Sequence, residues 1–185
     1  MIPDDTQFPI PNDEPERLEA LRRYGAFGLL RSTVFDDIAR LAAFICRTPL
    51  SMISLIDSNR QWFLAKNGID SCETSREASF CAHALVGNEM LIVEDARVDA
   101  RFARNIMVTE EPFIRFYAGA PLLTAEGYAL GTLCVVDYVP RILSIEQIDA
   151  LRSLSHLVMT QLESSRLKRE MRVLKQSLTL RPAPR

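Results

Sequence analysis

Apolar residues near the start of the chain repeat at the spacing of a helix. Leu18, Leu21 and Tyr24 follow one another at three-residue intervals within an otherwise polar segment. A repeat of this kind places apolar side chains on one face of a helix, so we predict a helix over residues 14–24. Gly25 follows directly, and glycine is common just beyond a helix C-terminus.

A second amphipathic helix is expected between Ser32 and Pro49. Either Ser32 or Thr33 can cap its N-terminus, because both carry a side-chain oxygen that accepts a backbone N–H, and Pro49 cannot continue a helix. The apolar residues between these signals repeat at intervals of three and four; they are Phe35, Ile38, Leu41, Ala42 and Ile45. One face of this helix should therefore pack on a core.

The middle of the chain has the pattern of strands joined by short turns. Alternating or β-branched apolar runs predict strands over 50–57, 61–66, 90–94, 114–123 and 128–138. Residues 124–127 are few enough to close a hairpin between the last two strands. Between the strands we expect a polar loop over 69–78 and one helical turn over 99–104. Ser79 can cap a short helix that ends near Gly87.

A long helix is predicted after Pro140, where Ser144 and Gln147 form a capping box, and it extends to about Gln176. Its first apolar stripe consists of Ile145, Ile148, Leu151, Leu154, Leu157, Val158 and Leu162. A second stripe consists of Leu167, Met171, Leu174 and Leu178. One small sheet cannot cover both stripes, so we expect the second to pair with another copy of the chain. The alternative is a helix that lies along its own domain.

The order of these elements places the chain in the α+β class. Helices at both ends flank a run of strands with short connections, and this order favours an antiparallel sheet with helices packed on it. A length of 185 residues fits one domain with a helical extension.

Charge and cysteine content argue against several classes of function. The net charge of −2 gives no overall attraction to nucleic acid or anionic membranes, although the first segment is acidic and the last is basic. No apolar run is long enough to span a bilayer, and the acidic, proline-rich start lacks the features of a signal peptide. The four cysteines form no CxxC pair, which disfavours structural zinc and a disulfide framework. We therefore expect a cytoplasmic protein without nucleic-acid or membrane partners.

Several segments combine small, apolar and cysteine residues, namely SFCAHAL (79–85), RFYAGAPL (115–122) and GTLCVVD (131–137). Together with ERLEALRRYG, FDDIARLAAFICRTPLSMISLIDSNRQWFLAKNG and IVEDARVDARFARN, they form an ordered series. This series resembles a bacterial GAF domain of the kind found beside histidine kinases and diguanylate cyclases. The resemblance divides the chain into a leader (1–13), the GAF domain (14–165) and a helical, basic extension (166–185).

The resemblance implies a GAF-like central antiparallel sheet. The terminal helices would pack on one face, where they often mediate dimers, and loops and helices would cover a ligand pocket on the other. The implied function is small-molecule sensing in signal transduction, relayed through a dimeric last helix to a kinase or cyclase output domain or to a partner. The ligand and any cofactor stay unidentified. The cyclic-nucleotide signature is missing, and Ala82 separates Cys81 from His83, which disfavours a bilin.

Aromatic, polar and cysteine residues of the matching segments form the predicted ligand site. They are Trp62, Phe80, Cys81, His83, Asp95, Arg101, Phe102, Phe116 and Cys134. Each also has a plainer interpretation: the aromatic residues as core, and the polar residues between Asp95 and Asn105 as groups that pin a loop. On a regular strand Phe116 and Tyr117 face opposite sides, so only one of them can face the pocket.

Cys81 is the strongest candidate for a reactive side chain. In the first turn of a helix capped by Ser79, its thiol lies near free backbone N–H groups that favour a thiolate. Arg76 and His83 could strengthen that field. The plainer interpretation is a small buried core residue. Cys72 lies nine residues earlier and could act as a resolving cysteine, which makes a free methionine-(R)-sulfoxide reductase the enzymatic alternative.

The sequence favours a sensor over an enzyme, because it contains no GxSxG, P-loop, HExxH or protein-kinase signature. We expect a homodimeric, non-enzymatic module that binds a small molecule and has no catalytic residue. Two alternatives stay open. One is redox sensing or sulfoxide reduction at Cys72 and Cys81, and the other is a dimerisation module whose pocket holds no ligand.

Overall fold

The computed structural model describes residues 8–24 and 33–179. The first two helices lie where the apolar spacing predicts them: α1 over Glu14–Tyr24 and α2 over Thr33–Cys46. Several expectations fall outside the described part of the chain. They concern the start of the leader, the Gly25 stop, the Ser32 cap, the side chain of Leu178 and the end of the basic tail.

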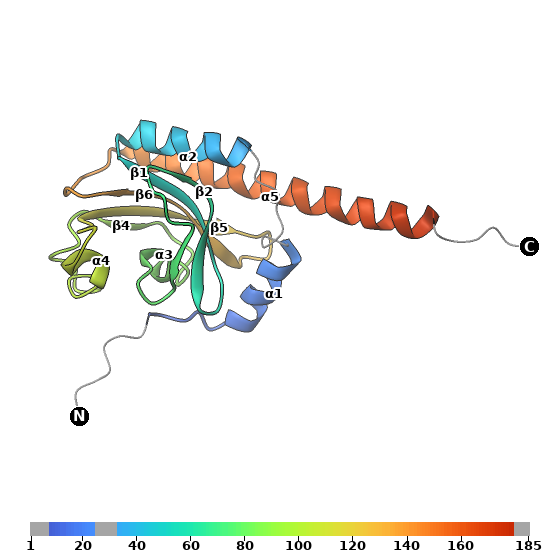
Figure 1. Cartoon of the computed structure of the whole chain (residues 1–185), viewed down its shortest axis with the longest axis horizontal. Coiled ribbons are helices and arrows are strands. Elements are labelled where there is room, and N and C mark those ends of the chain that lie inside the picture. Colours follow the sequence, from blue (N-terminus) through green and yellow to red (C-terminus); the bar gives the residue numbers. More distant parts are fainter. Residues whose placement is uncertain (1–7, 25–32, 180–185) are drawn as a thin grey trace, which may run out of the picture.

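The strands form one antiparallel sheet (Figure 1). They are β1 (Leu50–Ile56), β2 (Arg60–Asn67), β3 (Glu73–Ser75), β4 (Leu91–Val93), β5 (Phe116–Leu123) and β6 (Ala129–Asp137). Their order across the sheet is β3-β2-β1-β6-β5-β4, and every neighbouring pair is antiparallel. The central strands β1 and β6 are buried along their whole length, although many residues separate them in sequence.

The connections differ from the prediction in three places. β3 lies within the predicted polar loop 69–78, and its polar residues are tolerated because it is an edge strand. α3 is a single short helix, Phe80–His83, that ends before the predicted Gly87. The helical turn expected over 99–104 is present, since the Ala103 N–H donates to the Asp99 carbonyl at 2.9 Å, but it is followed by a helix that was not predicted. The helix in this region is α4 (Ile106–Thr109), and its cap Asn105 accepts a hydrogen bond from the Met107 N–H.

Each face of the sheet has its own hydrophobic core. On one face α1, α2 and α5 cover a cluster that includes Phe35 and Leu133. On the other face α3, α4 and the connecting loops cover a second cluster, which includes Phe102 and Tyr117. Figure 1 shows α2 and α5 together on one side of the sheet and α3 and α4 on the opposite side. This is the predicted α+β arrangement, with a helical face and a face covered by loops and short helices.

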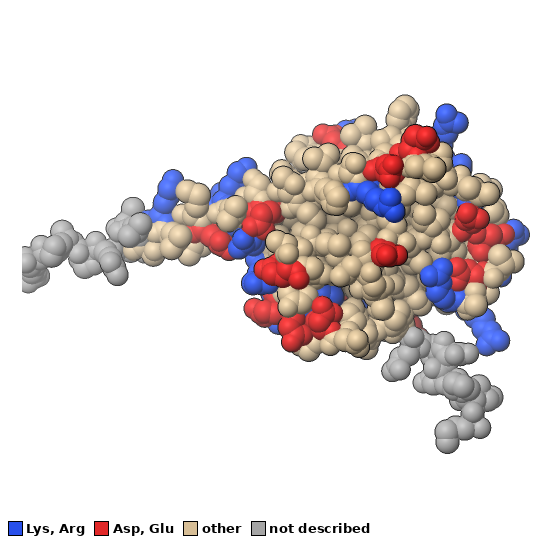
Figure 2. Space-filling view, turned by 180° about the vertical axis from the view of Figure 1, so that it is seen from behind, with Lys and Arg blue, Asp and Glu red and all other residues tan. Residues whose placement is uncertain are grey.

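The last helix, α5 (Ile145–Thr179), has a packed part and a projecting part. Its predicted capping box forms: the Gln147 N–H donates to Ser144 Oγ at 3.3 Å, and the Ser144 N–H donates to Gln147 Oε1 at 2.9 Å. Apolar residues between Leu151 and Leu162 pack into the helical-face core. Beyond them the helix leaves the domain, and Figure 2 shows basic side chains on this projecting part. Within the described ranges, no helix combines the length and apolar character that a membrane span requires.

Candidate functional site

α3 places a cysteine against the centre of the sheet. Ser79 caps α3 as predicted, since its backbone is extended and its Oγ accepts the Ala82 N–H at 3.1 Å. The same hydroxyl donates to Gln61 Oε1 on β2. Cys81 therefore lies in the first turn of α3 and contacts β6, with 2 % of its surface exposed.

Cys81 belongs to a buried polar group that we call the thiol cluster. Its members are Ser54, Gln61, Cys81, Tyr117 and Cys134. Tyr117 Oη donates to Cys81 Sγ at 3.3 Å, and Gln61 Nε2 donates to the same sulfur at 3.4 Å. The distance between Cys81 Sγ and Cys134 Sγ is 3.7 Å. Buried polar groups cost free energy unless they are paired, so these contacts stabilise the cluster at the centre of the sheet.

The neighbours of Cys81 favour its thiolate. Burial raises the pKa of the Cys81 thiol, but hydrogen bonds within the cluster, that from Cys134 first, outweigh burial and lower the pKa to about 6. The pKa of the Cys134 thiol is raised, first by its hydrogen bond to Cys81 and then by burial. Burial also raises the pKa of Tyr117. The hydrogen bonds therefore favour a thiolate at Cys81 over one at Cys134.

The groups predicted to stabilise that thiolate lie elsewhere. Arg76 Nη1 donates to Glu14 at 2.5 Å. The ring of His83 lies edge-on against Phe102, with 4.7 Å between ring centroids, and burial lowers the pKa of His83 below its usual value. The stabilisation of the Cys81 thiolate thus comes from hydrogen-bond donors on the sheet.

Aromatic side chains close the thiol cluster off from solvent. Phe80 of α3 stacks on Phe102 with 4.1 Å between ring centroids, and its centroid lies 5.3 Å from that of Tyr117. All three rings are buried. Packed side chains therefore occupy the space between α3 and the sheet, and a ligand that enters here must separate Phe80 from Phe102.

The topology, the covered face and the residue pattern agree with one family. The family model of the GAF domain matches residues 30–162. This chain belongs to the GAF domain family. The match includes the whole sheet, the α3–α4 cover and the packed part of α5, so the thiol cluster lies inside the GAF domain.

A cyclic di-GMP phosphodiesterase of Pseudomonas aeruginosa is 42% identical to this chain over 159 residues, which are 85% of this chain and 27% of that protein. The chain thus spans about a quarter of the length of this curated relative.

Two solved structures illustrate the fold. One is the GAF domain of a phosphoenolpyruvate-protein phosphotransferase from Acinetobacter (TM-score 0.61, 16% identity, covering 84% of this chain and 96% of that chain). The other is the free methionine-R-sulfoxide reductase of Neisseria meningitidis in complex with its substrate (TM-score 0.61, 14% identity, covering 88% and 97%). At these identities the likeness shows the fold alone.

The GAF domain brings most of the predicted site residues to one place. In or under α3 lie Phe80, Cys81, His83, Phe102 and Cys134. Arg101 lies at the edge of this group, where it pairs with Asp99 at 2.6 Å and its guanidinium is 5.3 Å from the centre of the Phe102 ring. Asp95 pairs instead with Arg97 at 2.6 Å. These local pairs match the interpretation in which the polar residues pin the loop.

Trp62 and Phe116 lie on the opposite face of the sheet. Both pack in the core beneath the long helices. The prediction that they line the ligand pocket is therefore wrong. The alternation of the strands is the physical reason. Tyr117, the neighbour of Phe116, contacts Cys81, and Gln61, the neighbour of Trp62, does the same.

Sequence reasoning missed Ser54 and Gln61, and it chose Phe116 for the site where the structure has Tyr117. The available signal was a polar residue inside a strand that is otherwise apolar, as with Ser54 in LSMISLID. Such a residue needs a hydrogen-bond partner when it is buried. Here Gln61 Nε2 donates to Ser54 Oγ at 2.9 Å.

The predicted pairing of Cys72 with Cys81 does not match the geometry. Cys72 is exposed, and its sulfur lies 3.5 Å from Lys66 Nζ. The thiol that contacts Cys81 is Cys134. Cys46 is the last residue of α2, and burial raises the pKa of its thiol to about 11.

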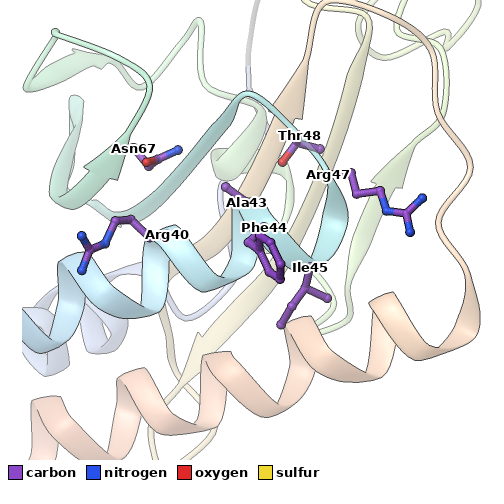
Figure 3. Close-up of a pocket in the computed structure, with 7 residues that line it drawn as sticks. All are labelled: Arg40, Ala43, Phe44, Ile45, Arg47, Thr48 and Asn67. Atoms are coloured by element: carbon purple, nitrogen blue, oxygen red, sulfur yellow. The ribbon is translucent and has the colours of Figure 1, made fainter.

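A surface hollow lies away from the thiol cluster (Figure 3). Its volume is about 660 Å³, and it is formed at the C-terminal end of α2 and the start of the sheet by Arg40, Ala43, Phe44, Ile45, Arg47, Thr48 and Asn67. The side chains of Arg40 and Arg47 point to opposite sides of the hollow. None of these lining residues belongs to the predicted site.

Proposed function

We propose that this GAF domain is a cytoplasmic sensory module of a bacterial signalling protein and that α5 carries its state to an output domain. The observation that carries the proposal is the presence of two apolar stripes along α5. One apolar stripe of this helix is part of the domain core, and the same unbroken helix then presents a second stripe to solvent. A continuous helix transmits a change in core packing to whatever its far end contacts.

The projecting stripe supports a homodimer. Leu167, Met171 and Leu174 are 47%, 57% and 62% exposed, and their spacing of four and three places them on one side of α5. Exposed apolar side chains in this arrangement are typical of a helix that pairs with another helix. A second copy of this chain offers the same stripe, and parallel pairing would bring both output domains to the same end.

The proposed signal originates beneath α3. A small molecule that separates Phe80 from Phe102 would move α3 away from β1 and β6. These central strands also carry the core into which α5 packs, so movement on the covered face would bias the packing of α5. The ligand would bind the open state of the cover better than the closed one, and that difference would supply the signal.

The relative of 42% identity supports an output in cyclic di-GMP signalling. An output domain that makes or breaks down this nucleotide is therefore favoured over a histidine kinase. Because this chain spans about a quarter of that relative, the output activity is part of the proposal.

Matched substitutions on adjacent residues of α5 test the relay. Leu174→Gln should raise the dimer dissociation constant at least about tenfold, because it places an amide in the paired stripe. Val173→Gln is the control, since Val173 is 60% exposed but lies off the stripe. Sedimentation velocity over a range of protein concentrations measures both variants. Native mass spectrometry of the unmodified protein measures any bound small molecule.

A strictly monomeric chain at every concentration would overturn the dimer relay. A dimer that Val173→Gln and Leu174→Gln weaken equally would place the interface elsewhere. A dimer that binds no small molecule would support a dimerisation module in place of a ligand sensor.

A further inference from the structure

The thiol cluster contains two cysteines from two elements of very different length. Cys134 lies on β6, a central strand of the sheet, whereas Cys81 lies on the four-residue helix α3. Their sulfur atoms are 3.7 Å apart, and 53 residues separate them in the chain. Within the described residues, no other two of the four cysteines have their sulfur atoms in contact.

We propose that Cys81 and Cys134 form a disulfide when the protein meets a peroxide and that this bond fastens α3 to the sheet. This inference goes beyond ligand sensing, because it assigns a modification site. It differs from the Cys72–Cys81 pair that the sequence analysis considered as an alternative. It requires only the two buried thiols and a peroxide as oxidant.

The geometry defines the role of each sulfur. Cys81 Sγ accepts hydrogen bonds from Tyr117 Oη and Gln61 Nε2, and donors of this kind stabilise a thiolate. Cys134 Sγ has Ser54 Oγ at 4.0 Å as its polar neighbour outside the pair. Cys81 is therefore the nucleophile and Cys134 the resolving thiol. The pKa of Cys81 agrees with this assignment, because the hydrogen bonds lower it despite burial.

Two steps account for all atoms and electrons. The Cys81 thiolate attacks one peroxide oxygen, so an S–O bond forms, the O–O bond breaks, and the leaving hydroxide takes up a proton to become water. The Cys134 sulfur then attacks the sulfenic sulfur of Cys81. The S–S bond forms, the S–O bond breaks, and the departing hydroxide takes the Cys134 proton to become a second water. The two thiols together supply the two electrons that reduce the peroxide.

Bond formation needs only a small movement. A disulfide has an S–S distance of about 2.05 Å, so the sulfur atoms must approach one another by about 1.7 Å from their present separation. The short helix α3 is the element that can supply this shift, because β6 is held between β1 and β5. Both thiols are buried, so peroxide reaches them when the cover over the cluster opens.

The test uses the full chain with Cys46→Ser and Cys72→Ser, which keeps only the two cluster thiols. After treatment with hydrogen peroxide, denaturation and alkylation, mass spectrometry should show the loss of both thiols and of two hydrogen atoms per chain. Peptide mapping should identify a Cys81–Cys134 link that a phosphine reductant reverses. Adding Cys134→Ser should stop the reaction at a sulfenic acid on Cys81, which dimedone traps. Mapping of the unmodified protein provides the same readout should the serine substitutions disturb folding.

Both thiols remaining alkylatable after peroxide treatment would overturn the proposal. So would a Cys72–Cys81 link in the unmodified protein, because it would support the alternative redox pair of the sequence analysis. Hydrogen exchange measures whether the disulfide holds α3 on the sheet. The amides of residues 80–85 should exchange more slowly in the oxidised chain, and an unchanged rate would exclude this effect of the bond. These readouts are independent of the α5 dimer, so failure here and failure of the proposed relay are separate results.

Discussion

At the scale of single residues, Gly119 makes room for the thiol cluster. It pairs with Cys134 across β5 and β6. A Cβ atom at this position would lie 2.1 Å from Tyr117 Oη and 2.7 Å from Tyr117 Cζ. The ring of Tyr117 therefore occupies the space that any side chain at position 119 would need, and glycine is required here for a close approach. This is how the phenol comes within hydrogen-bond distance of Cys81.

Gly119→Ala should destabilise the protein by about 1–3 kcal/mol, because the buried Tyr117 ring must move. The displaced hydroxyl should lose its hydrogen bond to Cys81. Urea unfolding measures the first effect, and the alkylation rate of Cys81 measures the second. Tyr117→Phe removes the hydroxyl alone, so combining the two substitutions should cost less than the sum of the single changes. Strict additivity would contradict this account.

At the scale of elements, a buried ionic group fastens α1 to the sheet. Glu14 accepts hydrogen bonds from Arg17 at 2.7 and 2.9 Å and from Arg76 at 2.5 Å. Both arginines are almost fully buried. Arg17 Nη1 also donates to the main-chain carbonyls of Ile56 at 2.9 Å and Ala129 at 3.3 Å. Two buried guanidinium groups thus share one carboxylate as their counter-charge where α1, β1, β6 and the segment before α3 meet.

Glu14→Gln should cost about 3 kcal/mol of unfolding free energy at neutral pH, because it leaves two buried guanidinium groups without a counter-charge. Burial raises the pKa of Glu14, but hydrogen bonds to Arg17 and Arg76 outweigh burial, so its folded pKa lies below 4.5. The stabilisation is therefore complete above the unfolded pKa and is lost as the pH falls through the folded pKa. Thermal unfolding over a series of acidic buffers measures this loss.

The control for Glu14 is Glu16→Gln, an exposed residue of the same helical turn. Its effect should stay within about 0.5 kcal/mol, and its acid sensitivity should equal that of the unmodified chain. If Glu14→Gln retained the full loss of stability in acid, the ionic group would not be its source.

At the scale of the whole molecule, contacts between the domain and α5 become few towards the far end of the helix. Arg169 donates to the Arg23 carbonyl at 2.8 Å, and the Arg166 guanidinium lies 5.7 Å from the centre of the Tyr24 ring. Beyond these contacts the side chains of residues 171–177 are all exposed. Residues 171–177 therefore lie outside the hydrophobic core of the domain.

A chain that ends after Glu170 should unfold in dilute solution at the same denaturant concentration as the full chain. It should also lose any dependence of thermal stability on protein concentration, because linkage to dimerisation is removed. Differential scanning calorimetry at several concentrations measures both effects. A lower stability of the shortened monomer would mean that residues 171–185 pack on the domain.

The local elements could be predicted from sequence because their causes are local. The spacing of apolar residues located α1, α2 and α5, and alternation located the long strands. The Ser79 cap and the Ser144–Gln147 capping box depend on side chains within three residues of each other, and both form. Neither β3 nor α4 was predicted, because a three-residue edge strand and a four-residue helix are too short to show a period.

The candidate site was predicted only in part, because its assembly is a property of the tertiary structure. The sequence by itself determined the family, the α+β class, the position of Cys81 in α3 and the second stripe of α5. The sheet order decided which side chains share a face, and it brought Ser54, Gln61, Tyr117 and Cys134 to Cys81. Contacts between residues so far apart in the chain depend on which strands are neighbours. Local patterns of polarity do not encode that order, although they help to set the register once two strands pair.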